Sequence, residues 1–148
     1  MKIICVGKIK EKFFVGAIEE YSKRISKYTK LEIIQISDEA NESVALKKEG
    51  EKILSKIKDN DYVVTLEIEG NSLTSLEFAK KIDNNFGSNK SLTFVIGSSY
   101  GLDDLVKQRS DYKLSFSKLT FPHQLFRVIF LEQLYRTYKI RHNESYHK

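Results

Sequence analysis

The stretch "DYVVTLEI", residues 61–68, is β-branched and almost wholly apolar. Such a run is typical of a strand that is covered on both faces, as the strands of parallel sheets are. The pattern changes to helical spacing on either side of it. Residues 42–58 separate apolar positions by charged ones, and residues 74–86 read as a helix that begins with a Thr or Ser cap. A buried strand between two helices is the repeating unit of an α/β fold.

The same alternation continues outward to both ends of the chain. Further strand patterns lie at 2–7, 31–37, 91–97 and 112–117, and further helical patterns lie within 11–29, at 103–110 and from about Pro122 to Ile140. Strands that alternate with helices predict an α/β fold with a mostly parallel sheet of five to six strands and helices on both faces. No repeat, linker or low-complexity segment interrupts residues 1–148, so we expect a single domain.

Composition limits the class of protein. The chain has 148 residues, of which 41% are hydrophobic and 11% aromatic, as in a globular domain. The single cysteine, Cys5, lies in an apolar run and is expected to be a core residue in a reducing compartment. No signal peptide or membrane-spanning run is present, so we expect a cytoplasmic protein without a membrane partner. The net charge of +5 favours a polyanionic partner without proving one.

Three loops follow predicted strands and contain the features of a ligand site. Gly70 follows the third strand, and Gly97 and Gly101 follow the fourth. The third loop, "SFSKLTFPHQLFR" (115–127), follows the fifth strand and holds the only proline of the chain. Ligands of open α/β sheets bind at the carboxyl ends of the strands, where glycine lets the backbone approach a ligand closely. The loops predict one pocket, although neither a dinucleotide fingerprint nor a P-loop is present.

The predicted helix at 122–140 changes its apolar side along its length. His123, Gln124 and Arg127 share one side of the first half, whereas Leu134 and Tyr138 line that side in the second half. A surface helix normally keeps one apolar stripe. The change is explained if the helix packs on its own sheet along one half and on a second copy of the chain along the other. The alternative is a helix that is buried within one domain.

All three histidines, His123, His142 and His147, lie in the last 26 residues among several arginines and lysines. Their spacing does not suit zinc and no cysteine is near, so we expect no metal site. No serine has the surroundings of a catalytic nucleophile. A basic tail with aromatic residues suits phosphate contact and base stacking, and a solvated charged terminus is the alternative.

Several segments resemble the ribosomal RNA large subunit methyltransferase H family, which belongs to the SPOUT class. They are "KIICVGKIKE", "TLEIEGNSLTSLEFA", "FVIGSSYGL", "LSFSKLTFPHQLFRVIFLEQLYRTYKI" and the terminal "YHK", so the resemblance covers essentially the whole chain. It implies a C-terminal trefoil knot and a homodimer that uses S-adenosyl-L-methionine. It also implies methylation of N3 of a pseudouridine in helix 69 of 23S rRNA, on the assembled ribosome.

The resemblance assigns cofactor contacts to the three loops already singled out. Ser98 stands where the family usually has a second glycine, and it fits only if its φ is not positive. Asn143 and Ser145 stand where glycine and proline are common, which predicts a looser tail. The cofactor contacts that the resemblance implies are Leu66, Gly97, Phe116, Ser117, Lys118, Leu119, Thr120 and Phe121.

Methylation at N3 requires loss of a proton, so a base or a group that stabilises the developing anion should help. Our candidates are His147 and Tyr146 in the tail, with His123 and Arg136 in support. Arg136 also lies four residues after Glu132, the spacing of a purely structural helix pair. RNA contact is expected to draw on Lys8, Lys10, Lys12, Lys23, Arg24, Lys27 and Lys30.

Two other functions remain compatible with the sequence. A non-catalytic factor that binds the ribosome or RNA on the same fold would also explain the charge and a dimer. A SPOUT methyltransferase that acts on tRNA is the second alternative, and the terminal sequence motif is what argues for rRNA instead. Titration with the cofactor separates the first alternative from an enzyme.

Overall fold

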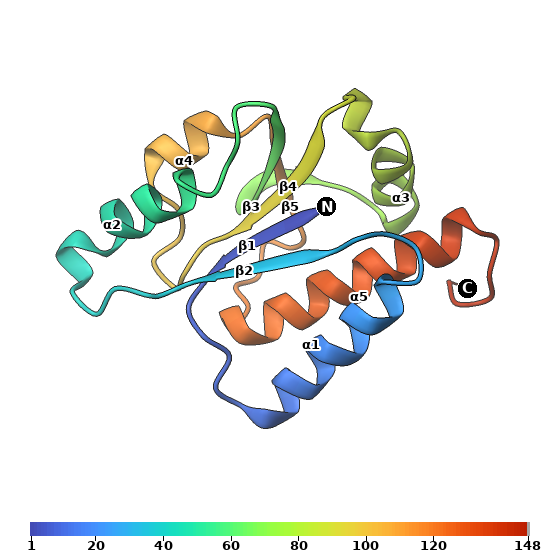
Figure 1. Cartoon of the computed structure of the whole chain (residues 1–148), viewed down its shortest axis with the longest axis horizontal. Coiled ribbons are helices and arrows are strands. Elements are labelled where there is room, and N and C mark those ends of the chain that lie inside the picture. The colour runs from blue at the N-terminus through green and yellow to red at the C-terminus, as the bar shows by residue number, and fades with distance from the viewer. Residues whose placement is uncertain (148) are drawn as a thin grey trace.

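The predicted α/β architecture with a parallel sheet is confirmed. A computed structural model describes residues 1–147, which form one five-stranded sheet in the order β2-β1-β4-β3-β5. Every neighbouring pair of strands is parallel, and Figure 1 shows the sheet through the middle of the molecule. The strands are β1 (Lys2–Val6), β2 (Glu32–Ile36), β3 (Asp61–Ser72), β4 (Ser91–Ile96) and β5 (Tyr112–Ser115).

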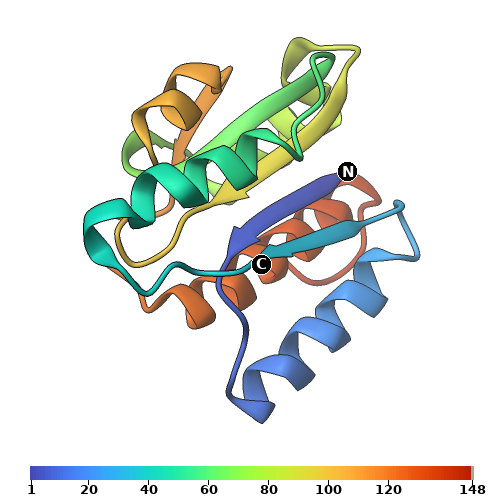
Figure 2. The same cartoon turned by 60° about the vertical axis from the view of Figure 1, so that its left-hand side comes forward.

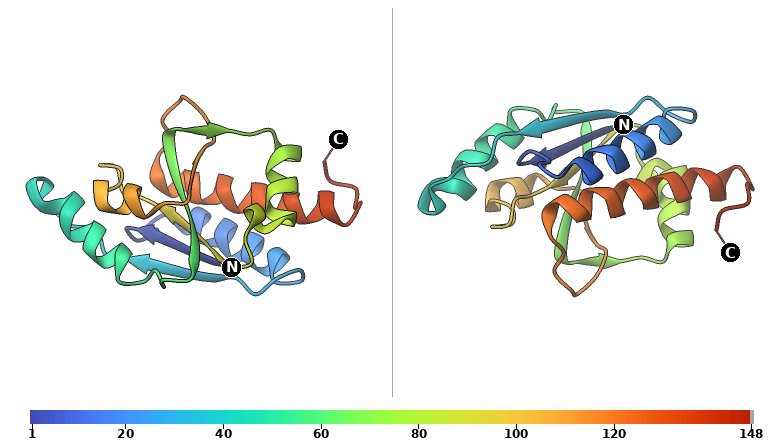
Figure 3. Two further views of the ribbon diagram at one scale, coloured as in Figure 1. Left: turned by 90° about the horizontal axis from the view of Figure 1, so that it is seen from above. Right: turned by 90° about the horizontal axis from the view of Figure 1, so that it is seen from below.

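Helices cover both faces of this sheet. One face carries α1, α3 and α5, of which α1 and α3 each contact α5, and the other carries α2 and α4 (Figures 1 and 3). No helix within residues 1–147 combines the length and apolar composition that a membrane span requires. The helices are α1 (Lys12–Ile25), α2 (Glu42–Leu54), α3 (Ser75–Asp83), α4 (Asp104–Arg109) and α5 (His123–Arg141), with a 3-10 turn η1 (Asn85–Gly87).

Two apolar cores explain why the central strands β1 and β4 and the first part of β3 are mostly apolar. Cys5 and Val64 point to the core beneath α1, α3 and α5, whereas Ile4 and Val63 point to the core beneath α2 and α4. Neighbouring residues of a strand face opposite sides, so a strand between two cores cannot alternate with polar residues. The prediction that Cys5 is a core residue is confirmed, since it is buried and unpaired.

β3 runs four residues beyond the predicted strand and contains an excursion. Leu114 of β5 pairs with both Leu66 and Asn71, so residues 67–70 bulge out between two paired segments. Gly70 permits this, because a Cβ there would lie 2.7 Å from the backbone carbon of Leu114. The loop that the glycine predicted therefore lies inside the strand.

α5 buries one continuous stripe against its own fold, which accounts for the change of side in its sequence. Arg127 belongs to that stripe because its guanidinium donates to the carbonyls of Val6 and Gly7. The residues on the opposite side of the helix are half-exposed. The buried residues of α5 are Arg127, Phe130, Leu131, Leu134, Thr137 and Tyr138.

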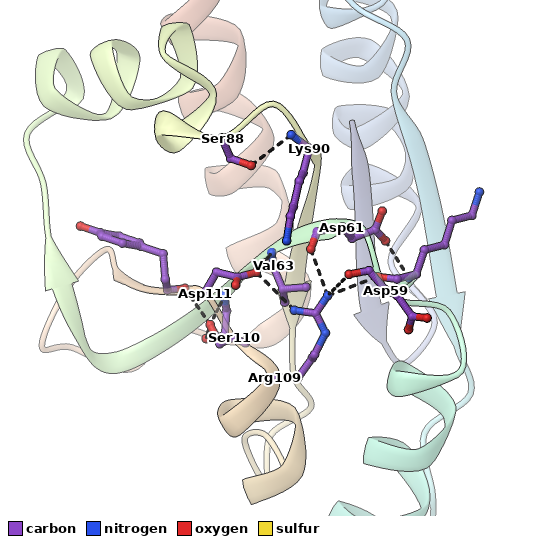
Figure 4. Close-up of polar contacts among 11 residues, drawn as sticks. Asp59, Asp61, Val63, Ser88, Lys90, Arg109, Ser110 and Asp111 are labelled. Carbon is purple, nitrogen blue, oxygen red and sulfur yellow. Dashed lines mark hydrogen bonds and ion pairs between the residues drawn. The ribbon is translucent and has the colours of Figure 1, made fainter.

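The amino-terminal edge of the sheet is tied together by polar contacts. The Arg109 guanidinium donates to the backbone carbonyl of Asp61 at 3.0 Å and to the Asp111 carboxylate at 3.2 Å. Asp111 in turn accepts from the N–H of Val63 at 2.8 Å (Figure 4). These bonds fix the end of α4 and the start of β5 against β3, at the edge opposite the predicted pocket.

A buried ion pair, Lys2–Asp61 at 2.9 Å, belongs to the same edge and leads to a stability prediction. Asp61→Asn leaves the Lys2 ammonium buried without its counter-charge, so we expect the free energy of unfolding, measured in urea, to fall by about 3 kcal/mol.

The same pair makes the stability depend on pH. Burial alone would raise the pKa of Asp61, but hydrogen bonds from the Lys58 N–H and Lys2 outweigh it, so the pKa is lowered. The stabilisation is then present above about pH 4 and is lost as pH falls through the folded-state pKa.

The matched control for this prediction is the exposed pair Glu20–Arg24 on α1. Glu20→Gln is expected to leave the unfolding midpoint almost unchanged, because exposed ion pairs contribute little. Equal effects of the two substitutions would contradict the assignment of the Lys2–Asp61 pair as a stabilising contact.

Candidate functional site

The three glycine- and proline-containing loops meet in one cavity, as their positions predicted. Its volume is about 970 Å³, and it lies at the carboxyl ends of β3, β4 and β5. Leu66 comes from β3, Gly97 follows β4, and Phe116 follows β5. Because all five strands are parallel, their carboxyl ends share this edge of the sheet.

Most of the residues assigned to cofactor binding line this cavity. Lys118 is the exception, since its exposed side chain is not part of the wall. It lies in a turn in which the Leu119 N–H donates to the Ser117 hydroxyl at 2.9 Å, and both of these neighbours are part of the wall. The assigned residues in the wall are Leu66, Gly97, Ser117, Leu119, Thr120, Phe116 and Phe121.

The loop after β4 is a tight turn that only glycine can enter at its first position. A Cβ on Gly97 would lie 2.2 Å from the carbonyl oxygen of Gly101, well inside van der Waals contact. The Gly101 N–H donates to the Ser98 carbonyl at 3.0 Å, and Gly101 has a φ of +90°. Ser98 is not among the residues with positive φ, so serine fits here without backbone strain.

The third loop is tied to the excursion in β3. The Ser115 hydroxyl donates to the carbonyl of Ile68 at 2.8 Å, and the Asn71 amide donates to the carbonyl of Lys113 at 3.0 Å. Gly70 packs directly on the backbone at 113–114. Two walls of the cavity, 66–72 and 113–117, are thus fixed to each other.

His123 lies at the cavity, where the first turn of α5 begins. It is part of the wall, and its Nε2 lies close to Gly7, at the end of β1. Partial burial lowers the pKa of His123, and the positive charge of Arg127 lowers it further. The imidazole is therefore neutral at pH 7 and has one nitrogen free to accept a proton.

The rim of the cavity is acidic, although the protein as a whole is basic. Four carboxylates and one ammonium group line it, and the closest ion pair among them, Lys107–Asp104, is 3.9 Å long. Apolar side chains form much of the remaining wall. The charged residues of the rim are Glu67, Glu69, Asp103, Asp104 and Lys107.

The other three catalytic candidates form a separate cluster at the far end of α5. Arg136 binds Glu132 at 2.5 Å, which confirms the pair predicted from their spacing. The Tyr146 hydroxyl donates to the same carboxylate at 3.1 Å, and the Arg136 guanidinium lies over the Tyr146 ring. Nδ1 of His147 lies 3.4 Å from the Arg136 guanidinium.

Tyr146 is not suited to act as a base. Burial raises the pKa of its phenol, and the neighbouring Tyr21 hydroxyl and Glu132 carboxylate raise it further. The phenol therefore stays protonated at neutral pH, and Tyr146 serves as a hydrogen-bond donor.

One chain does not bring all four catalytic candidates together. His123 and Arg136 are thirteen positions apart on the helix, which amounts to about 20 Å along the axis. His123 borders the cavity, whereas Arg136, Tyr146 and His147 lie beyond its reach.

The tail is held in place, contrary to the looseness expected from Asn143 and Ser145. Asn143 has a φ of +51°, a conformation that asparagine tolerates after a helix. Glu144 accepts from the Tyr28 hydroxyl at 2.9 Å and pairs with Lys139. Tyr28 also stacks on Tyr138 of α5. The turn after α1, which holds Tyr28, and helix α5 together therefore fix the start of the tail. Figure 2 shows α1 and α5 lying side by side.

Sequence reasoning missed two polar side chains that shape the site. Gln124 accepts from the Lys10 N–H at 2.8 Å and so fixes the loop after β1 to the first turn of α5. Glu49 is buried in α2 and binds Ser98. Glu49 lies four residues from both Ala45 and Ile53, and this spacing places it on the buried face of α2. The sequence therefore contained the indication that this carboxyl group is buried.

No group of three or more His, Cys, Asp or Glu side chains within residues 1–147 is arranged to hold a metal ion.

Comparison with protein families gives a match over nearly the whole chain. The family described as "Predicted SPOUT methyltransferase" matches residues 1–147. A protein of Clostridium perfringens (strain SM101 / Type A) named ribosomal RNA large subunit methyltransferase H 1 is 54% identical, with 99% of this chain and 98% of that protein covered. The ribosomal RNA large subunit methyltransferase H of Clostridium botulinum (strain Kyoto / Type A2) is 52% identical, with 100% and 99% covered.

A solved structure supports the fold alone. The structure of a probable methylase family protein from Haemophilus influenzae Rd KW20 is similar with a TM-score of 0.57 at 13% identity. The similarity covers 99% of this chain and 70% of that one.

Proposed function

The chain belongs to the SPOUT methyltransferase family, and from this premise we propose that it methylates N3 of a pseudouridine in helix 69 of 23S rRNA. We propose S-adenosyl-L-methionine as the methyl donor and the assembled ribosome, in the cytoplasm, as the substrate. The observation that carries the proposal is the cavity at the carboxyl ends of β3, β4 and β5, whose wall contains seven of the eight residues assigned to the cofactor. The names of the two clostridial relatives support rRNA as the substrate.

The cavity has the size and chemistry that this donor requires. A volume of about 970 Å³ lies within the range of small-molecule sites. Leu66, Leu114 and Phe116 offer apolar surface to a purine, and the turn at Gly97 brings backbone groups close to a ligand. The acidic rim suits a ligand that carries positive charge on an ammonium and a sulfonium group. The donor supplies a methyl group attached to a positively charged sulfur.

We also propose that residues around the cavity form the trefoil knot of the SPOUT class. The contacts of Ser115 with Ile68 and of Asn71 with Lys113 support this, because they hold the segment before α5 against the excursion in β3. In a knot, these contacts would keep the walls of the cavity together without a disulfide bond or a metal.

A homodimer would bring the tail cluster to the cavity. On the solvent side of α5, half-exposed Leu125, Val128 and Ile129 precede Glu132 and Arg136. Two such helices that pair antiparallel through the apolar residues bury them in a closed two-fold contact. In that arrangement the tail end of one α5 lies beside the cavity end of the other.

In such a dimer the residues of this chain divide the chemistry. N3 would lose its proton as it takes the methyl group, whose bond to the donor's sulfur breaks with the electron pair staying on sulfur, and the tail offers His147 as the acceptor of the proton. Arg136 and the protonated Tyr146 stabilise the negative charge that develops on the uracil ring. His123 remains on the cavity side, where its neutral imidazole can accept a hydrogen bond. Much of the acceleration is expected to come from positioning.

Basic residues near the cavity would contact the RNA backbone. Lys8, Lys10 and Lys12 are exposed on and beside the loop that Gln124 holds against α5. Phosphate contacts orient a nucleic acid without reading its sequence.

The proposal is tested by mass spectrometry of RNA from cells that lack this protein. We expect one methyl group to be missing from a pseudouridine of 23S rRNA and to return when the wild-type gene is supplied. Unchanged 23S rRNA would contradict the proposal. A methyl group missing from tRNA instead would identify a tRNA methyltransferase, and absence of S-adenosyl-L-methionine binding would favour a non-catalytic factor.

A further inference from the structure

A buried carboxyl group stands behind the cavity without being part of its wall. Glu49 of α2 has an exposed fraction of 2% and does not line the cavity. Its Oε1 accepts from the Glu39 N–H at 3.0 Å, and its Oε2 accepts from the Ser98 hydroxyl at 2.8 Å. No ion pair within residues 1–147 involves it. Burying a carboxyl group is costly, so its two hydrogen bonds point to a specific role.

Ser98 transmits this contact into the turn that forms the cavity wall. Its hydroxyl oxygen also lies 3.3 Å from the N–H of Tyr100, which donates to it. Its carbonyl accepts from the Gly101 N–H at 3.0 Å. The hydroxyl therefore bonds outward to Glu49 and inward to the turn. Glycine at position 98 could make neither side-chain contact.

The next residue of α2 holds the other end of the same loop. A Cβ on Gly50 would lie 2.6 Å from Cβ of Asp103, so only glycine lets α2 approach this closely. The Asp103 carboxylate in turn accepts from the Leu105 N–H at 2.8 Å and caps α4. Glu49 and Gly50 thus contact the two ends of the loop, at Ser98 and Asp103.

We propose that Glu49 is a positioning residue for the donor site, acting through Ser98 to fix the turn at 97–101. This inference rests on the proposed function, because it takes S-adenosyl-L-methionine as the ligand of the cavity. The turn itself is fixed in the free protein, so its rigidity can be measured without any ligand. The serine that replaces the usual second glycine of the family provides the link.

The test measures two quantities, the Kd for S-adenosyl-L-methionine and the hydrogen exchange of the Gly101 amide in the free protein. We expect Ser98→Ala and Glu49→Leu each to weaken binding about tenfold, and Gly101 exchange to become faster by a similar factor. Since Ser98→Ala and Glu49→Leu remove the same contact, the double variant should bind S-adenosyl-L-methionine little more weakly than either single variant. Glu49→Gln keeps an acceptor for the Glu39 N–H and a partner for Ser98, so it should largely restore both quantities.

Ser88→Ala is the matched control. The Ser88 hydroxyl accepts from the Lys90 N–H at 3.0 Å, at the opposite end of β4, as Figure 4 shows. This change should leave the Kd and the Gly101 exchange unaltered. Wild-type values of both quantities in Ser98→Ala would overturn the inference, as would additive losses in the double variant. Failure of the wild-type protein to bind S-adenosyl-L-methionine would count against the proposed function, while Gly101 exchange would still decide the role of Glu49.

Discussion

Gly97→Ala is expected to abolish measurable binding of S-adenosyl-L-methionine and methyl transfer with it. The added Cβ would lie 2.2 Å from the carbonyl oxygen of Gly101, and that atom belongs to the backbone, so the whole turn must move. A shift of about 1 Å in groups that position a reactant can cost on the order of 10²-fold in rate. We expect a loss of at least that size in the Kd from calorimetry.

Gly16→Ala is the control for this substitution. Gly16 lies in α1, and a Cβ there meets no atom within 4 Å. Alanine in a helix interior is expected to stabilise the protein by about 0.5–1 kcal/mol and to leave binding unchanged. Normal binding by Gly97→Ala would show that the turn after β4 does not hold the donor.

Truncation after Ile140 is expected to separate methyl transfer from donor binding. It removes Tyr146 and His147 but leaves every residue of the cavity wall in place. The Kd for S-adenosyl-L-methionine should stay close to that of the full chain. Transfer to ribosomes should fall by about 10²-fold or more, the usual contribution of a positioned acid or base.

Arg141→Ala is the control for the truncation, because Arg141 is also removed by it. The Arg141 guanidinium binds Asp83 of α3 at 2.7 Å and takes no part in the tail cluster. This variant should transfer methyl groups normally. If the truncated chain also methylated ribosomes at the normal rate, the tail would have no catalytic role.

The fold and the cavity could be predicted because both follow from local pattern. Apolar strands such as 61–68 are needed wherever a sheet lies between two layers of helices, and parallel strands bring their carboxyl ends to one edge. The loop after Gly97 and the loop at 115–127 were therefore expected at one edge of the sheet, and the structure has them there. Gly70 indicated a loop, but pairing of Leu114 with Asn71 after the excursion could not be read from local sequence.

Hydrogen bonds between polar groups that are far apart in the sequence could not be predicted. Arg127 is buried because the carbonyls of Val6 and Gly7 happen to lie within its reach, 120 residues earlier in the chain. The contact between Glu49 and Ser98 likewise joins residues that are 49 positions apart. Sequence alone also grouped His123 with the tail, whereas the length of α5 holds them at opposite ends.

The most direct test of a site shared between two copies is the activity of a mixed dimer. Gly97→Ala subunits have an intact tail, and subunits truncated after Ile140 have an intact cavity, so only a mixed dimer contains one complete site. If the two forms carry different affinity tags and are produced together, sequential purification isolates that species. We expect about half of the wild-type transfer rate from the mixed dimer, although each parent is inactive. An inactive mixed dimer, or a wild-type chain that scatters light as a monomer, would contradict the account.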